Sequence, residues 1–258
     1  MISHKFFFFL GKGGSGKTTL SILFSKFFGK NTLLFSLDPA HNISDYLGLK
    51  EKKEFKEFKN IFIYEPDIEK LIDKKAFEES RKIEKISPLF ILFEDSLKEN
   101  FRFLPGIEED CMIDLIIKGF YDNYDRVIFD MPPTALSLRI VSLILMRKKL
   151  LSFLLNQRKK IIELRKILGE KIEKDPVYEK IKENLNMYEK FYPEFKKSIF
   201  FVVYNPFEAS IKEGDRINDF LKKNGLIVKK IMNRVKEGSF KGFDIIIPEI
   251  ENPLKLFE

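Results

Sequence analysis

The stretch "FFFFLGKGGSGKTTLS", residues 6–21, decides the fold class of this chain. Within it, Gly11–Thr18 matches the phosphate-binding-loop (P-loop) pattern G-x-x-x-x-G-K-[ST]. An apolar run precedes the loop, and a helix is expected from about Lys17 to Phe28. Glycines let backbone N–H groups converge on phosphate oxygens, and the positive end of the following helix points at the same anion. The stretch therefore predicts a strand–loop–helix unit that binds a nucleotide.

The residue types in the loop predict individual roles. Lys17 is placed to reach the β- and γ-phosphates of ATP, and the Thr18 hydroxyl is placed to hold Mg²⁺. ATP and Mg²⁺ are therefore the expected ligands. The predicted nucleotide-binding residues of the loop are Gly11, Lys12, Gly13, Gly14, Ser15, Gly16, Lys17, Thr18 and Thr19.

Short apolar runs bounded by turn residues recur along the chain and are typical of buried parallel strands. The expected strands are Lys5–Leu10, Thr32–Leu37, Asn60–Tyr64, Arg126–Asp130, Ser198–Tyr204, Val228–Met232 and Asp244–Ile247. Helical patterns lie between most of them. This alternation predicts an α/β fold of the P-loop NTPase type, with a mostly parallel central sheet flanked by helices.

Two helix-rich stretches, residues 68–124 and 139–197, are too long to be simple crossovers. No linker rich in proline or glycine separates them from the strands. We therefore expect a single domain, residues 1–258, in which these stretches pack together as a helical lobe inserted between core strands.

Charge and composition indicate which classes of partner and which cellular location to expect. The formal net charge is +7, but the basic residues are interleaved with acids, as in "KDPVYEKIKENLNMYEK", which is typical of solvated helix faces. No nucleic-acid partner is predicted. No apolar stretch reaches the roughly 18 residues of a membrane span. The sequence predicts a cytoplasmic protein with no integral membrane segment.

The loop carries a second lysine, Lys12, and "KGGSGKTT" resembles the deviant Walker A motif. In the ATPases with that motif, the early lysine reaches across a dimer interface to the nucleotide of the partner. Such a lysine offsets phosphate charge that develops during transfer. The resemblance implies an ATP-dependent homodimer and a catalytic Lys12; the alternative is an exposed loop lysine.

Two further segments resemble the family of arsenical pump-driving and tail-anchored-protein-targeting ATPases. The first is "SLDPAHNISDYLG", similar to the family's switch I. The resemblance implies that Asp38 orients the attacking water, with Lys12 and Lys17 as the other catalytic residues. It also implies that Pro39 and His41 belong to the switch.

The second segment, "RVIFDMPPTALSLRIV", is similar to the family's switch II. Asp130 ends an apolar strand, as a Walker B aspartate does, and is expected to hold Mg²⁺ directly or through water. Pro132, Pro133 and Thr134 would couple the state of the γ-phosphate to a helix that starts near Leu136. Upstream, "LPGIEE" resembles another family segment.

Near the C-terminus, "IMNRVKEG" and "IIPEIENP" resemble the strand end and the loop that hold adenine in this family. Asn233 is the candidate for reading the adenine edge, because a carboxamide both donates and accepts hydrogen bonds. Pro248 would pack on the base.

The chain also departs from the family. Arsenite binding needs several thiols, and the only cysteine is Cys111, for which a place in the core is favoured. The CxxC pair that joins subunits of the targeting members through zinc is absent. By spacing, Phe207 stands where the family has a glutamate at the partner's nucleotide, with Glu208 one position away, so that role is not carried over.

Methionines, which suit a groove for varied apolar clients, are few in the lobe: Met112, Met146 and Met187. The lobe does contain "IVSLILMRKKLLSFLLNQ", residues Ile140–Gln157, which is apolar on nearly all faces. It is either a client groove or a helix buried in the lobe's own core.

These observations predict a Mg²⁺-dependent ATPase that acts as a nucleotide-driven dimeric switch. A carrier or targeting factor for a hydrophobic protein client is the first interpretation. The alternatives are the driving subunit of an anion or metalloid transporter, which needs a membrane-protein partner, and a regulatory ATPase of the partitioning or positioning type. The sequence does not identify the client.

Overall fold

The computed structural model of the chain describes residues 5–38, 43–49, 54–84, 102–171, 174–236 and 240–250. The chain divides into two compact units, Met1–Ile140 with Lys197–Glu258, and Val141–Lys196. Residues 68–124 therefore group with the sheet, whereas residues 141–196 form a unit of their own. The two halves of the expected helical lobe fall in different units.

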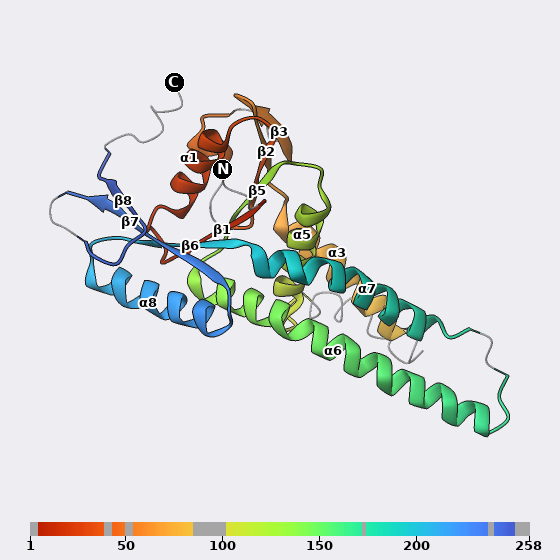
Figure 1. Ribbon diagram of the computed structural model, residues 1–258. Helices are drawn as coiled ribbons and strands as arrows, with labels where there is room; N and C mark the ends of the chain where they lie inside the picture. The colour runs from red at the N-terminus through yellow and green to blue at the C-terminus, as the bar shows by residue number, and fades with distance from the viewer. Residues whose placement is uncertain are drawn as a thin grey trace. The chain divides into compact units, whose positions relative to one another are not determined.

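The first unit is built on a sheet whose described strands follow the order β3-β4-β2-β5-β1-β6-β7-β8 (Figure 1). All neighbouring strands pair in parallel except β3 and β4. The α/β fold with a mostly parallel sheet is thus confirmed. The strands are β1 (Phe6–Gly11), β2 (Thr32–Ser36), β3 (Phe55–Phe58), β4 (Ile61–Tyr64), β5 (Arg126–Asp130), β6 (Ile199–Tyr204), β7 (Ile227–Val235) and β8 (Ile245–Pro248).

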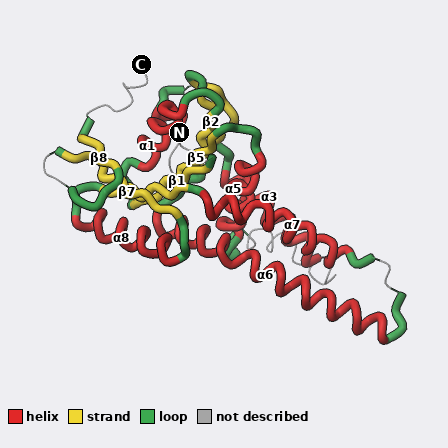
Figure 2. Tube along the Cα trace, in the orientation of Figure 1, coloured by secondary structure: helices red, strands yellow, loops and turns green. Residues whose placement is uncertain are grey.

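Helices cover both faces of this sheet, with α1 on one side and α8 on the other (Figures 1 and 2). Because β1 lies between β5 and β6, the loop that follows it sits near the middle of the sheet edge. The described helices are α1 (Lys17–Phe28), α2 (Ile43–Tyr46), α3 (Ile68–Glu84), α5 (Ile107–Tyr121), α6 (Thr134–Ile167), α7 (Pro176–Lys197) and α8 (Glu208–Lys223).

The phenylalanine side chains of β1 contribute to the hydrophobic core on both faces of the sheet. Successive side chains of a strand point to opposite faces. Phe7 packs against Phe28 of α1, with ring centroids 4.6 Å apart. On the other face, Phe6 stacks on Phe120 of α5 at 3.7 Å. Phe8, on that same face, is fully buried. The run is therefore a strand with an aromatic core on each side.

Strand β3 was not predicted. It alternates exposed and half-buried residues, unlike the continuous apolar runs of the central strands. It forms a hairpin with β4 through Lys59 and Asn60, whose φ angles are 46° and 70°. Two successive positive φ angles are the signature of a type I′ turn, which suits two-residue hairpins. The edge strand escaped prediction because it lacks a continuous apolar run: its sequence, FKEF, has two charged residues at its centre.

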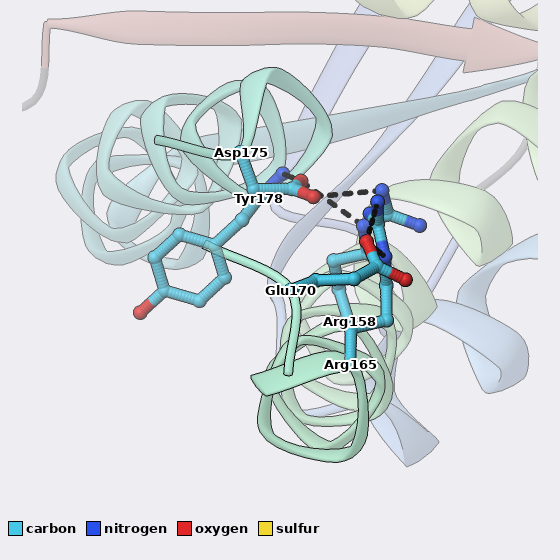
Figure 3. A network of polar contacts seen from close by, with 5 residues as sticks. All are labelled: Arg158, Arg165, Glu170, Asp175 and Tyr178. Atoms are coloured by element: carbon cyan, nitrogen blue, oxygen red, sulfur yellow. Dashed lines mark hydrogen bonds and ion pairs between the residues drawn. The ribbon is translucent and has the colours of Figure 1, made fainter. Parts of the chain in front are cut away.

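The second unit is an antiparallel helical hairpin formed by α7 and the part of α6 from residue 141 onward. Near its base, the Tyr188 hydroxyl donates to the Ile144 carbonyl at 2.5 Å. At the far end, Arg158 makes two hydrogen bonds of 3.0 and 2.8 Å to Asp175 (Figure 3). The backbone N–H of Tyr178 donates to the same carboxylate at 2.8 Å, so Asp175 also caps α7.

No helix in the described part of the chain is both long enough and apolar enough to cross a membrane.

Candidate nucleotide site

The P-loop connects the end of β1 to the start of α1. Gly14 and Gly16 have φ angles of 77° and 96°, which residues with a side chain rarely adopt. The N–H of Ser15 donates to the Lys12 carbonyl at 3.1 Å and closes the turn. Lys17, at the first position of α1, is 5% exposed. The predicted strand–loop–helix unit is present, with its lysine held at the helix N-terminus.

Thr18 and Asp130, the two residues predicted to hold Mg²⁺, are in contact. The Thr18 hydroxyl donates to Asp130 Oδ2 at 2.7 Å, and both side chains are buried. The register of β1 and β5 places Asp130 opposite Phe9, two residues before the loop. Hydroxyl and carboxylate oxygens are the ligands that Mg²⁺ prefers. This oxygen pair therefore fits the ion that the sequence predicts.

Asp38 lies beside this pair at the same edge of the sheet. The register of β2 and β5 places Ser36 opposite Asp130, and the N–H of Leu37 donates to the Asp130 carbonyl at 2.9 Å. Asp38 follows directly and is 4% exposed. The structure thus brings the two predicted carboxylates to adjacent strand ends. Pro39 and His41 lie outside the described residues.

Helix α2 is anchored by a buried ion pair that the sequence did not suggest. Lys56 of β3 and Glu65, which follows β4, are 3.0 Å apart and only 8% and 12% exposed. Ser44 of α2 donates its N–H to Glu65 at 3.0 Å, and its hydroxyl contacts both partners. These contacts hold α2 to the β3–β4 hairpin, close in sequence to the predicted switch I.

The predicted switch II leads from β5 into α6, which begins at Thr134, two residues earlier than expected. The Ser137 hydroxyl donates to the Pro132 carbonyl at 2.6 Å and its N–H to the Pro133 carbonyl at 3.1 Å. The Thr134 hydroxyl is buried without a hydrogen-bond partner among the described residues. An orphaned buried hydroxyl is unusual and marks a place where a ligand oxygen would fit.

A second contact ties the start of α6 to α5. Arg139 Nε lies 3.0 Å from Glu109, whose side chain is 7% exposed. Glu109 belongs to the "LPGIEE" segment, so two segments chosen for their resemblance meet in the structure.

The adenine-side candidates share one pocket of about 400 Å³. Asn233 and Pro248 line it together with Thr19, and its remaining lining residues are Leu20, Leu23, Arg234, Ile247, Glu249 and Ile250. The volume is within the range of small-molecule sites. The Asn233 amide donates to the Ser15 carbonyl at 2.9 Å, which the sequence did not predict.

An irregularity in β7 sets the position of Asn233. The pairing of β7 with β8 shifts register between Met232 and Val235, and Arg234 has a φ angle of 58°. A bulge of this kind re-aims side chains and is common next to binding sites. Here it accompanies the turn of Asn233 toward the P-loop.

Sequence reasoning also missed Asn205, which directly follows β6. It is 6% exposed, and its amide contacts the P-loop. Its position at the carboxyl end of a strand was the available signal, because ligands gather there in open α/β sheets. Lys12 is half-exposed on the loop, and Phe207 is 65% exposed at the start of α8.

Comparison with known proteins agrees with the predicted family. A sequence model described as anion-transporting ATPase matches residues 4–239. The chain is 32% identical, over 248 residues, to "Putative arsenical pump-driving ATPase 2" of Aquifex aeolicus, covering 89% of this chain and 79% of that protein.

Two eukaryotic relatives are longer than this chain. "ATPase ASNA1 homolog" of Plasmodium falciparum is 30% identical, over 87% of this chain and 61% of its own length. "ATPase get3" of Schizosaccharomyces japonicus is 36% identical, over 54% of this chain and 44% of its own length. The chain therefore spans less than two thirds of these two proteins. On the strength of the family match and the P-loop fold, the chain belongs to the anion-transporting ATPase family and is an ATP hydrolase.

Proposed function

We propose that this ATPase is a Mg²⁺-dependent, nucleotide-driven dimeric switch that carries a hydrophobic helical segment of a client protein. The observation that carries the client part is an exposed apolar stripe on α6. The residues at the ends of the parallel strands, among them Lys17, Asp38 and Asp130, would bind and hydrolyse ATP.

The chain's own residues have distinct tasks in hydrolysis. Lys17 and the loop N–H groups bind the β- and γ-phosphates, and Asp38 orients the attacking water in line with the γ-phosphate. Thr18 and Asp130 would hold Mg²⁺, which would offset the charge of the phosphates. Asn233 and Pro248 hold the adenine in the pocket beside Thr19.

Lys12 would act in the ATP-bound dimer. Lys12 is half-buried on the loop, whereas Lys17 is 5% exposed. In a dimer joined face to face, each Lys12 would reach the nucleotide of the partner and stabilise the developing phosphate charge. The dimer would then form with ATP and weaken after hydrolysis.

The apolar stripe consists of exposed side chains along α6 that are spaced three or four residues apart, except between Phe153 and Ile161, where the polar residue Gln157 takes the intermediate position. Its members are Leu143 (40% exposed), Met146 (65%), Leu150 (55%), Phe153 (57%), Ile161 (44%), Leu164 (60%) and Leu168 (80%), the last just beyond the helix end. At 3.6 residues per turn, this spacing places them on one helix face. Of the two interpretations of residues 140–157, the exposure favours the client surface.

The stripe also has the length that its proposed occupant needs. From Leu143 to Leu168, a rise of 1.5 Å per residue gives about 38 Å. The hydrocarbon core that a transmembrane helix crosses is about 30 Å thick. A transmembrane helix of a client would therefore lie along the stripe with its apolar surface covered. Such a helix is also the client class implied by the resemblance.

The transporter alternative is less well supported. Cys111 is buried, its Sγ lies 3.7 Å from the Leu71 carbonyl, and burial raises the pKa of the thiol to about 11. A metal-binding thiolate needs a lowered pKa. This cysteine behaves as a core residue, so thiol capture of a metalloid within one chain is disfavoured.

A capture experiment tests the client proposal. A biotinylated apolar peptide of roughly 20 residues, the length of a membrane span, is the probe. The variants are Met146→Glu and Phe153→Glu, with Phe27→Glu, at a 78% exposed site on α1, as the matched control. The wild type and the control should keep the peptide in solution with Mg²⁺ and a non-hydrolysable ATP analogue.

The two stripe variants should lose roughly tenfold or more in peptide affinity, because burying one large apolar side chain contributes about 1.5–3 kcal/mol. They should retain ATP hydrolysis, which shows that the nucleotide site is intact. Equal capture by all four proteins would contradict the proposal.

A further inference from the structure

Asn205 directly follows β6, next to the P-loop. In the register of β1 and β6, Val203 lies opposite Gly11, the first residue of the loop. Asn205 is two residues further along, at the same sheet edge, and is 6% exposed. A carboxamide buried to this degree needs hydrogen-bond partners.

The partner of the Asn205 amide is the P-loop backbone. In one orientation of the amide, its nitrogen donates to the Gly14 carbonyl at 3.3 Å. In the orientation that satisfies both ends of the amide, the nitrogen donates to the Ser15 carbonyl at 3.0 Å and to the Tyr204 carbonyl at 3.2 Å. Either way, the acceptor is a carbonyl of the loop.

The backbone of Asn205 is itself fixed. Its N–H donates to the Ser210 hydroxyl at 2.9 Å, and Ser210 is a buried residue of α8. The N–H of Phe207 donates back to the Asn205 carbonyl at 2.7 Å. These bonds tie Asn205 to the start of α8, so its amide is a rigid support for the loop.

Because of the geometry of the peptide bond, a hydrogen bond to the Ser15 carbonyl also fixes the direction of the Gly16 N–H. In a trans peptide, the carbonyl of one residue and the N–H of the next point in opposite directions. Holding the Ser15 carbonyl toward the strand ends therefore aims the Gly16 N–H toward the other side, where a phosphate would bind. Asn233 donates to the same carbonyl at 2.9 Å, and a carbonyl oxygen has two lone pairs.

We propose that Asn205 is a positioning residue of the ATPase site, which holds the Ser15 peptide so that the loop N–H groups face the nucleotide phosphates. Together with Asn233, it forms a clamp of two amides from the ends of β6 and β7. The inference rests on nucleotide binding at the P-loop.

The test compares Asn205→Asp and Asn205→Ala with wild type. Asn205→Asp keeps the shape of the side chain but replaces the donor with an oxygen that repels the carbonyls. Asn224→Asp is the matched control, because the Asn224 amide donates to the Phe220 carbonyl at 2.8 Å, at the other end of α8. Calorimetry measures ADP binding, ligand-observed NMR measures adenosine binding, and thermal melts check folding.

Both Asn205 variants should bind ADP roughly 2- to 10-fold more weakly, as expected for one lost hydrogen bond, with Asn205→Asp at least as weak as Asn205→Ala. Adenosine, which has no phosphate, should bind them as it binds wild type. Asn224→Asp should bind both ligands normally.

Two results would overturn the inference alone: wild-type ADP affinity in Asn205→Asp, or an equal loss of ADP and adenosine in both variants. The first would show that shape suffices, and the second that the pocket as a whole is damaged. If wild type bound adenosine but gained nothing from the phosphates of ADP, both the inference and the proposed nucleotide site would fail.

Discussion

At the scale of single residues, buried carboxylates are the strongest constraint at the site. Asp130 is fully buried and Asp38 is 4% exposed, at the ends of adjacent strands. A buried charge is costly unless hydrogen bonds or a cation compensate it. Thr18 supplies one hydrogen bond to Asp130. Asp38 and Asp130 are therefore consistent with a site that binds a cation and a polarised water molecule.

Replacing Asp38 with asparagine separates chemistry from binding. Asp38→Asn removes the carboxylate that orients water but keeps its size, so the turnover number for ATP should fall roughly 100- to 10,000-fold. ADP affinity should change little, because the P-loop is untouched. Steady-state hydrolysis and calorimetry make the comparison.

Asp73→Asn, at an exposed position of α3 outside the predicted switch segments, is the matched control and should hydrolyse ATP normally. Normal turnover in Asp38→Asn would remove Asp38 from the catalytic residues.

The sequence identified site residues only where a motif or a resemblance contains them. Asp38, Asp130 and Asn233 were found in this way, and they do lie at one sheet edge. Asn205 was missed because its partner is a backbone carbonyl, which leaves no pattern in the side chains.

At the scale of elements, hydrophobic pattern decided what was predictable. All seven predicted strands are present. The continuous apolar runs of β1, β2, β5 and β6 are buried, as expected for the centre of a sheet covered on both faces. The eighth strand, β3, is exposed on one edge and lacks that pattern. The hairpin turn at Lys59 and Asn60 gave only a weak signal, because lysine is not typical of a type I′ turn.

The aromatic core around β1 predicts a sharp contrast between two phenylalanines. Phe8 is fully buried and stacks on Phe129 at 4.6 Å, whereas Phe27 is 78% exposed. Phe8→Ala should lower the free energy of unfolding by about 3–5 kcal/mol. Phe27→Ala should change it by about 0.5 kcal/mol or less.

Urea unfolding followed by circular dichroism measures both variants. Similar losses in the two would mean that β1 is not packed between helices as described.

The end of the α6–α7 hairpin predicts a pH dependence. The hydrogen bonds from Arg158 hold the pKa of Asp175 below its usual value (Figure 3). A carboxyl group with a lowered folded-state pKa stabilises the fold above its unfolded pKa of about 4 and loses that effect as the pH falls through the folded value. Asp175→Asn should therefore melt at a lower temperature than wild type at pH 7.

The difference in melting temperature between wild type and Asp175→Asn should stay constant down to about pH 5 and shrink below about pH 4. Glu183→Gln, at a 70% exposed carboxylate on α7, should show no comparable difference. A gap between wild type and Asp175→Asn that is the same at pH 3 and pH 7 would contradict the role of the charge.

At the scale of the whole molecule, the chain separates nucleotide chemistry from the apolar stripe. The P-loop, the two carboxylates and the adenine-side pocket belong to the unit of residues 1–140 and 197–258, and the stripe residues belong to the unit of residues 141–196. One helix, α6, supplies Thr134 at its first residue and the stripe further along. Helices α3 and α5, which lie within the predicted lobe stretch of residues 68–124, belong to the unit of the sheet. The helical periodicity of the sequence predicted these helices, but it did not predict which elements they pack against.

The central claim is that ATP brings two copies of the chain together through Lys12. Mass by light scattering tests it most directly, with ADP and then with Mg²⁺ and a non-hydrolysable ATP analogue. The proteins are wild type, Lys12→Ala and the control Lys30→Ala, an exposed lysine just beyond α1. Wild type and Lys30→Ala should change from the mass of one 30.5 kDa chain to that of two only with the analogue. Lys12→Ala should remain a single chain. A wild-type mass that does not respond to the analogue, or a Lys12→Ala protein that dimerises like wild type, would contradict the account.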